Sequence, residues 1–377
     1  MTNIPTASRL PKKAPSKASV FTFLVIAAIY IAVFALEQII PPSSMLFTVL
    51  KKGATYALVA VSMNLLNGFT GLFSLGQAGF MLIGAYAYGI FTIPVAQRTA
   101  VYQYYDGGLV QFAMPFLPAL LLAGLFAALF AFLIGLPVLR LKSDYLAIAT
   151  LGFAEIIRSI FQWDKLGAIT NGSNMLRLFP TFNDFNIKNA NGEVVVYLST
   201  LVPFVISGVC IALIVLLIHS SHGRAFMSIR DDEVAAEAMG INLARHKQYA
   251  FCISSFFSGI GGAMLAMYSN SVQAKSFTSA MTYEILLIVV IGGIGSVTGS
   301  CLSSFLFVAC SEWWLRFLDQ EQTIAGWHVP LLRNGFRLVV FSLIIMVVVL
   351  FFRKGIMGTK ELPDFFRKKP AKKEAVK

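Results

Sequence analysis

The chain has 377 residues, of which 57% are hydrophobic and only 13% are charged. Soluble globular domains carry about a quarter charged residues, so this composition excludes an ordinary water-facing surface. The net charge of +12 lies mainly at the two ends of the chain, as in membrane proteins with basic cytoplasmic tails, rather than in a nucleic-acid-binding patch. Apolar windows of about 20 residues, the length that crosses a bilayer, recur between the ends. We therefore expect an all-α, polytopic helical membrane protein that binds membrane lipid and no nucleic acid.

Three regions follow one another along the chain. Residues 1–19 form a basic N-terminal tail, residues 20–352 a transmembrane domain, and residues 353–377 a basic C-terminal tail. The first apolar stretch, 21–40, is too long for the apolar region of a signal peptide and does not end in a small-residue cleavage site. We interpret it as a retained first membrane span.

About ten membrane segments are predicted within the transmembrane domain. They cover residues 20–40, 50–66, 77–94, 112–137, 145–162, 198–219, 248–270, 281–293, 298–317 and 334–352.

Two Gly-rich breaks, NGFTGLFSLG (67–76) and GGIGSVTG (292–299), separate apolar stretches. Glycine weakens helices, and at membrane depth the freed backbone must be satisfied by protein or by a water-lined cavity. We therefore expect both breaks to face the protein interior. Their similar setting in the two halves suggests a pseudo-repeat, and interrupted helices at corresponding positions point to a transport pathway near the midplane.

An even number of spans puts both termini on one side of the membrane. With the termini cytoplasmic, nineteen of the thirty Lys and Arg residues lie inside and eight outside, as the positive-inside rule requires. The loop 220–247 is then cytoplasmic and the loop 163–197 extracytoplasmic. The outer loop is either a docking surface for an external partner or a simple connection.

The cytoplasmic loop contains the polar stretch SIRDDEVAAEAMGINLARHK (228–247). Acids at Asp231–Glu233 favour a helix start, the alanines that follow favour helix, and Gly240 is placed to end it. Ala235, Ala236 and Met239 form a small apolar face. Such a helix suits a groove on a partner protein. The alternative is an amphipathic helix on the lipid surface, but those are usually basic with bulkier apolar faces.

Four motifs, in this order along the chain, carry a family resemblance. They are GLFSLGQAGFMLIGAYA (71–87), LRLKSDYLAIATLGFAEIIR (139–158), GRAFMSIRDDEVAAEAMGI (223–241) and EILLIVVIGGIGSVTGS (284–300). The third resembles the cytoplasmic coupling loop of ABC importer permeases. Together they resemble the branched-chain amino acid ABC transporter permeases of the LivM type, over roughly residues 45–352. The related urea permeases share several of these motifs.

The resemblance implies a mechanism and a set of partners in a bacterial plasma (inner) membrane. A second permease subunit (LivH-like) would complete the pathway, two ATPases (LivG-like and LivF-like) would use ATP and Mg, and an extracytoplasmic solute-binding protein would deliver branched-chain amino acids. This chain itself would bind no cofactor and catalyse no reaction. The residues that match the coupling motif or flank it are Arg230, Asp231, Asp232, Glu233, Ala235, Ala236, Glu237 and Gly240.

Pathway candidates come from the two breaks and their borders. They are Gly71, Ser74, Gly76, Gln77, Gly79, Gly292, Gly293, Gly295, Ser296 and Gly299. Small residues also serve close helix packing in membranes, which is an equally good explanation for most of them. Gln77 is the best lining candidate, because a glutamine in lipid needs a polar partner.

Ionisable residues inside spans are costly and often functional. Glu155 and Arg158 are three residues apart and Glu312 and Arg316 four apart, which permits ion pairs on one helix face. We favour structural pairing over contact with a solute.

Other functions are less well supported. The four histidines and four cysteines show no metal-ligand spacing, and no phosphate-binding GxxxxGK[ST] loop is present, so metal and catalytic sites are not predicted. The alternatives that remain are a urea or short-chain amide permease of the same family and an ion-coupled secondary carrier.

Overall fold

Helices make up most of the protein in the computed structural model. The structure describes residues 17–141, 143–189, 191, 193–319, 323–324, 327–328, 336–351, 355–358 and 361, so most of both predicted tails lies outside the described residues. A helix lies at each of the ten predicted segments: α1 (Lys17–Ile39), α2 (Met45–Asn64), α3 (Gln77–Thr92), α5 (Phe116–Val138), α6 (Ser143–Phe161), α8 (Leu201–Ile218), α11 (Leu243–Ser269), α12 (Ser279–Gly292), α13 (Val297–Val308) and α14 (Phe336–Phe351).

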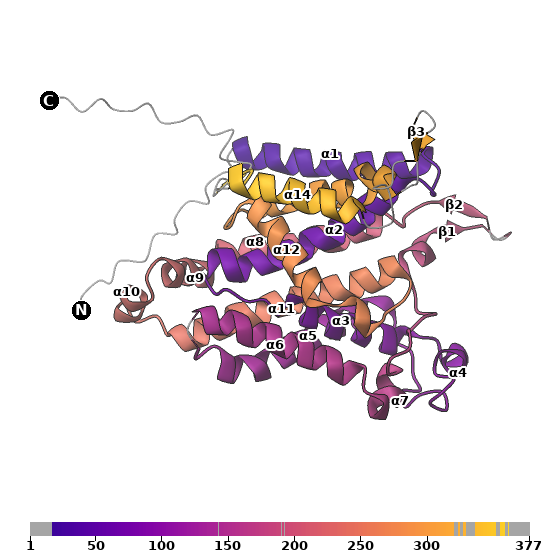
Figure 1. Ribbon diagram of the computed structural model, residues 1–377, viewed down its shortest axis with the longest axis horizontal. Coiled ribbons are helices and arrows are strands. Elements are labelled where there is room, and N and C mark those ends of the chain that lie inside the picture. Colours follow the sequence, from indigo (N-terminus) through magenta and orange to yellow (C-terminus); the bar gives the residue numbers. More distant parts are fainter. Residues whose placement is uncertain are drawn as a thin grey trace, which may run out of the picture.

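Shorter elements connect these helices at the two ends of the molecule. They are α4 (Arg98–Val101), α7 (Gly167–Thr170), α9 (Ser221–Asp231), α10 (Glu233–Ala238), and the antiparallel pairs β1 (Ile187–Lys188) with β2 (Val194–Val196) and β3 (Thr323–Ile324) with β4 (Trp327–His328). Figure 1 shows α9 and α10 at one end of the long axis and α4, α7, β1 and β2 at the other. The loops 220–247 and 163–197 therefore lie at opposite ends, which we name the α9–α10 end and the α4–α7 end.

Four described helical stretches are long and apolar enough to cross a membrane alone. They are Met45–Phe69, Phe116–Val138, Leu201–Ile218 and Leu243–Ser269. Two bent pairs, α3 with Val95–Val101 (101°) and α6 with Asp164–Thr170 (63°), raise the number to six, and Leu24–Ile39 and Ser279–Gly292 are shorter apolar helices. The protein is thus membrane-embedded and helical, while the number of ten spans stays a prediction.

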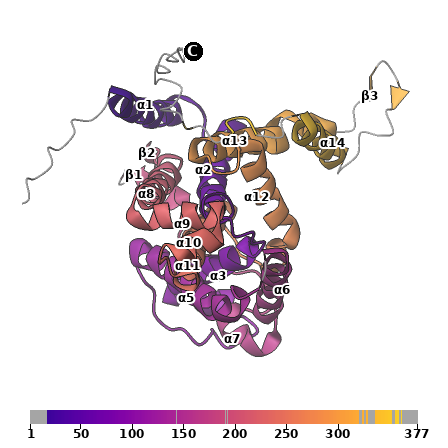
Figure 2. The ribbon, with the colours of Figure 1, turned by 90° about the vertical axis from the view of Figure 1, so that its left-hand side faces the viewer.

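Glycines bring the central helices into close contact. A Cβ on Gly84 of α3 would lie 2.0 Å from the Gly259 carbonyl oxygen of α11, and one on Gly262 would lie 1.9 Å from the Met81 oxygen. Where lipid is as apolar as the side chains, such close backbone packing holds helices together. Helix α11 packs in this way against α2, α3 and α5, whereas α1 and α14 lie at the edge of the bundle (Figure 2).

A buried carboxylate joins α1 to α8 at the α4–α7 end. Glu37 is 4% exposed and accepts hydrogen bonds from the backbone N–H groups of Thr200 (2.6 Å) and Leu201 (3.2 Å) and from the Ser199 hydroxyl (2.9 Å). A negative charge there complements the positive end of the α8 dipole.

A buried guanidinium fixes the connection between α3 and α5. Arg98 is 1% exposed and donates to the carbonyl oxygens of Ile90 (2.9 Å), Phe112 (2.7 Å) and Val110. The side chain thereby satisfies three carbonyls that the bend after α3 would otherwise leave without a donor.

Both interruptions of helix lie within the predicted Gly-rich breaks. Helix α2 continues into a π-helical turn, Leu65–Phe69 (η1), and the chain is then non-helical until α3 begins at Gln77. The second interruption, Gly293–Ser296, separates α12 from α13. Gly71, Gly293 and Gly295 have positive φ angles of 76°, 116° and 88°, which glycine adopts without the steric cost that a Cβ would add.

Candidate functional site

The segment between α8 and α11 folds as a two-helix elbow, because its helix ends are encoded locally. Helix α9 ends where the backbone of Asp232 becomes extended (φ −160°, ψ 111°). The Asp232 side chain caps α10 by accepting from the N–H groups of Val234 (2.9 Å) and Ala235 (3.0 Å). Gly240, with φ +85°, ends α10, and the Ile241 N–H donates to the Ala236 oxygen at 3.1 Å. This is the pattern of a glycine-terminated helix, so α10 begins and ends where the sequence predicts.

The elbow exposes most of α10 at the tip of the molecule. Val234 and Met239 are 78% and 84% exposed, and Glu237 and Ala235 are exposed as well. Ala236, which we expected on the same partner-binding face as Ala235 and Met239, is instead 3% exposed and points into the protein. A helical turn places adjacent residues about 100° apart, so Ala235 and Ala236 do not share one face. The exposed surface of α10 therefore includes Val234, Ala235, Glu237, Ala238 and Met239.

One ion pair joins the elbow to α11, and a second lies within α9. Glu233 accepts from the Lys247 ammonium at 2.6 Å, which joins α10 to α11. Arg230 pairs with Asp231 at 2.9 Å. Glu233 and Arg230 are thus engaged with this chain, while Asp231 remains largely exposed.

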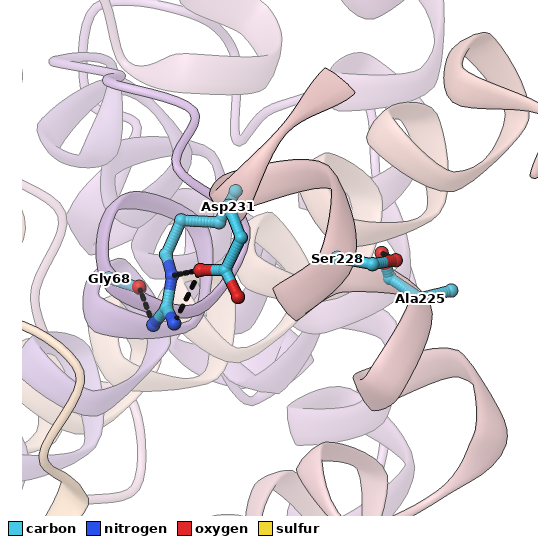
Figure 3. A network of polar contacts seen from close by, with 5 residues as sticks. Gly68, Ala225, Ser228 and Asp231 are labelled. Carbon is cyan, nitrogen blue, oxygen red and sulfur yellow. Dashed lines mark hydrogen bonds and ion pairs between the residues drawn. The ribbon is translucent and has the colours of Figure 1, made fainter. Parts of the chain in front are cut away.

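Arg230 also reaches from α9 to the first helix break. Its Nη1 donates to the Gly68 carbonyl oxygen of η1 at 3.1 Å. In Figure 3 this hydrogen bond is the dashed line that ends at Gly68, next to the dashed lines of the ion pair with Asp231. A Cβ on Gly71 would lie 3.0 Å from the Arg230 Cγ. Glycine at position 71 therefore lets α9 sit directly on the break.

Asn64 joins the first break to the second. It is fully buried and donates to the Ser296 carbonyl (2.9 Å) and the Ser300 hydroxyl (2.8 Å), while its Oδ1 accepts from the Gly295 N–H (2.8 Å). A chain of direct contacts thus runs from α9 through η1 and Asn64 to the Gly293–Ser296 interruption. The sequence reasoning missed Asn64, although an asparagine in an apolar span beside a break is a usable signal.

Gln77 lies at the start of α3 in a buried polar cluster. Its Nε2 donates to the Ser254 hydroxyl (3.1 Å), and its Oε1 accepts from Ser258 (2.5 Å). Ser62 of α2 joins the cluster through a 2.8 Å contact with Ser258. Gln77 has the polar partners that a glutamine in lipid needs, and they belong to α11, a helix for which no polar role was predicted.

The other pathway candidates surround the breaks and pack closely. A Cβ on Gly79 would lie 2.9 Å from the Ala154 Cα of α6, and one on Gly76 3.2 Å from the Thr150 oxygen. Gly292 and Gly299 face each other, since a Cβ on Gly299 would lie 2.2 Å from the Gly292 oxygen.

The two serines among the candidates bond to nearby backbone, Ser296 as the cap of α13 and Ser74 in the turn before α3. The Ser296 hydroxyl caps α13 by accepting from the Gly299 N–H at 3.0 Å, and the Ser74 hydroxyl accepts from the Gly76 N–H at 3.4 Å. These positions shape the breaks.

Part of the predicted C-terminal tail also packs on the second break. The Ile356 N–H donates to the Ile291 oxygen at 2.7 Å, and the Glu361 carboxylate accepts from the N–H groups of Val297 and Thr298 at the start of α13. The sequence gives no local signal for this contact.

One of the two predicted ion pairs is present. Glu155 and Arg158 pair at 2.6 Å, as expected. Glu312, in contrast, pairs with Lys52 of α2 at 2.5 Å, and the Arg316 guanidinium donates to the Met45 sulfur at 3.0 Å. The turn Ala309–Trp314 is π-helical rather than α-helical, which changes the residue spacing on which the Glu312–Arg316 prediction relied. Within the described residues no group of His, Cys, Asp and Glu side chains could hold a metal ion.

Comparison with known proteins identifies relatives of this chain. A family model described as branched-chain amino acid transport system / permease component matches residues 45–352. The high-affinity branched-chain amino acid transport system permease protein LivM of Escherichia coli (strain K12) is 33% identical over 291 residues, which cover 72% of this chain and 64% of that protein. LivH of the same strain is 22% identical over 343 residues, covering 86% of this chain and 98% of LivH.

A more distant relative is the probable permease protein LivM of Methanocaldococcus jannaschii, 23% identical over 276 residues that cover 67% of this chain and 76% of that protein. The chain thus spans 64% of the length of its enterobacterial LivM relatives. No solved structure matches it. Since the family model covers most of the sequence, from the second predicted span to the last, the chain belongs to the branched-chain amino acid transport system permease family.

Proposed function

We propose that the chain is the transmembrane permease subunit of an ATP-powered importer of branched-chain amino acids. The observation that carries this proposal is the α9–α10 elbow, which presents an exposed tip while Arg230 binds the first helix break. A secondary carrier needs no exposed helix that is hydrogen-bonded to its broken helices, whereas a subunit moved by a separate ATPase does.

The mechanism follows from the chain of contacts. The importer has two cytoplasmic ATPases, which bind ATP and Mg, and one of them binds the exposed tip of this chain at Val234, Ala235, Glu237 and Met239. When the ATPases close on each other, α9 moves. The hydrogen bond from Arg230 to Gly68 moves the first break, and the hydrogen bonds of Asn64 move the second break with it. Such coupling requires that the tip prefer different arrangements in different nucleotide states. The ATPases thus supply the work, and this chain supplies the moving helices.

The complete assembly contains further proteins. A second permease subunit closes the pathway, and a solute-binding protein docks on the α4–α7 end, which is extracytoplasmic. Both chain termini and the elbow face the cytoplasm of a bacterial cell, across the plasma (inner) membrane.

The test is co-purification followed by uptake. The chain is co-expressed with a second permease and a candidate ATPase pair, and Glu237→Arg and Gly240→Arg are compared with Glu193→Arg, an exposed residue of the outer loop. Glu237→Arg reverses a charge in the contact, and contacts at the centre of an interface contribute about 2 kcal/mol or more. Gly240→Arg strains the backbone that ends α10, because its φ is +85°. We therefore expect ATPase recovery to fall more than about tenfold for the two tip variants only. Retention of the ATPases by both tip variants would refute the coupling assignment.

Uptake by the reconstituted complex then identifies the solute. ATP-dependent accumulation of labelled leucine supports the proposal, and accumulation of urea instead would move the chain to the urea-transporting relatives. Accumulation by this chain without the ATPases would identify it as a secondary carrier.

A further inference from the structure

The exposed side of α6 differs from the exposed sides of the helices that face lipid. The strongly exposed hydrophobic residues of α5 and α8 are leucines, valines and a few phenylalanines, among them Leu117, Leu121, Leu125, Leu133, Val205, Val209, Leu213 and Leu216. The exposed side of α6 also includes Gly152 and Ser159. A Cβ on Gly152 would meet no atom within 4 Å. This side of α6 is therefore less suited to lipid than its neighbours.

An ion pair lies on the same side of α6. The Glu155 carboxylate accepts from Arg158 and, through its other oxygen, from the Ser279 hydroxyl of α12. The side chains of Arg158 and Glu155 remain 28% and 37% exposed. Glu155 lies six residues, or about 9 Å, before the end of the helix, within the predicted membrane segment 145–162. Partly exposed charges in a membrane segment are costly against lipid and favourable against water or polar groups.

A shallow, wide-open groove lies over these residues. Its volume is about 380 Å³, and it is lined by Glu155, Ile156, Ser159, Ile160 and Trp163. The carboxylate, a hydroxyl and two isoleucines come from α6, and the indole of Trp163 follows the end of that helix. A small molecule with a branched apolar group and an ammonium group that can share the Glu155 carboxylate with Arg158 matches this lining. Because the groove is open, another protein surface must close it.

We infer that this groove is a solute-contact site of the translocation pathway, in which Glu155 binds the α-ammonium group of an amino acid while Ile156, Ile160 and Trp163 contact its branched side chain. The site rests on the proposed function, because the second permease subunit supplies its other wall. It also distinguishes the two solute classes, since uncharged urea has no ammonium group for Glu155 to bind.

Cysteine labelling tests the inference without disturbing the ion pair. In the assembled complex, with the four native cysteines replaced by serine or alanine, Ser159→Cys is compared with Leu125→Cys on the lipid-facing side of α5. A membrane-impermeant methanethiosulfonate reagent should modify Ser159→Cys at least about tenfold faster, and leucine-loaded binding protein with ATP should change that rate. Equal, slow modification of both cysteines would overturn the site.

A charge-neutral variant tests the role of the carboxylate. With saturating leucine-loaded binding protein, Glu155→Gln should lower the maximal leucine uptake about tenfold or more, while the ATPases stay bound and continue to hydrolyse ATP. Normal uptake by Glu155→Gln would refute the role of Glu155. Absence of ATP-dependent leucine uptake by the unmodified complex would instead refute the proposed function, and this site with it.

Discussion

Replacing Asn64 with alanine removes the side chain that joins the two helix breaks. Asn64 makes three hydrogen bonds of 2.8–2.9 Å to Gly295, Ser296 and Ser300. Hydrogen bonds between membrane helices contribute about 0.6 kcal/mol each on average, so the loss is about 2 kcal/mol. The Ser296 carbonyl keeps the Ser300 N–H as a donor at 3.2 Å, and Gly295 is only half-buried, so no large penalty for an unpaired group is added.

The measurement is the free energy of unfolding of the purified chain, obtained by SDS titration in mixed micelles and followed by far-UV circular dichroism. Asn67→Ala is the matched control, since the Asn67 Oδ1 accepts one hydrogen bond, from the Ser74 N–H at 3.2 Å. Its Nδ2 has no partner among the described residues. We expect a loss of less than about 1 kcal/mol for this variant. Equal stabilities of the two variants would refute the idea that Asn64 holds the breaks together.

Four further substitutions probe other positions in the same assay. Gly84→Val should destabilise the chain by at least about 2 kcal/mol, because its Cβ would collide with the backbone of α11. Gly152→Ala meets open space, so its stability should be unchanged or rise by up to about 1 kcal/mol through helix propensity. A loss for Gly152→Ala comparable to that of Gly84→Val would contradict the packing argument. Glu37→Gln keeps the shape but removes the charge that caps α8, so a loss of about 1 kcal/mol is expected, and an unchanged stability would show that the cap charge contributes nothing. Arg98→Met leaves three carbonyls without their charged donor and should lower the free energy of unfolding by about 3 kcal/mol or more. Proteolysis should become faster first at the α4–α7 end. A loss of stability below about 1 kcal/mol would mean that water replaces the guanidinium.

Local features of this protein could be read from its sequence. The apolar runs predicted the helices. The acidic run Asp231–Glu233 and Gly240 predicted the two ends of α10, and the glycines of 67–76 and 292–299 predicted the positions of the breaks. Each of these depends on residues within one or two helical turns, because apolar length, capping and positive φ are properties of a short stretch of chain. The four ordered motifs also pointed to the family.

Contacts between distant segments were decided only by the tertiary structure. Asn64 and Ser296 are 232 residues apart, and Arg230 and Gly68 are 162 apart, so no pattern in the sequence brings them together. Ala236 is buried rather than on the exposed face of α10, and Glu312 pairs with Lys52 rather than with Arg316. In lipid every face of an apolar helix meets a similar solvent, so hydropathy marks which segments enter the membrane but not which side of each helix meets its neighbours. That choice is made by close backbone packing and by the few polar groups that must find partners.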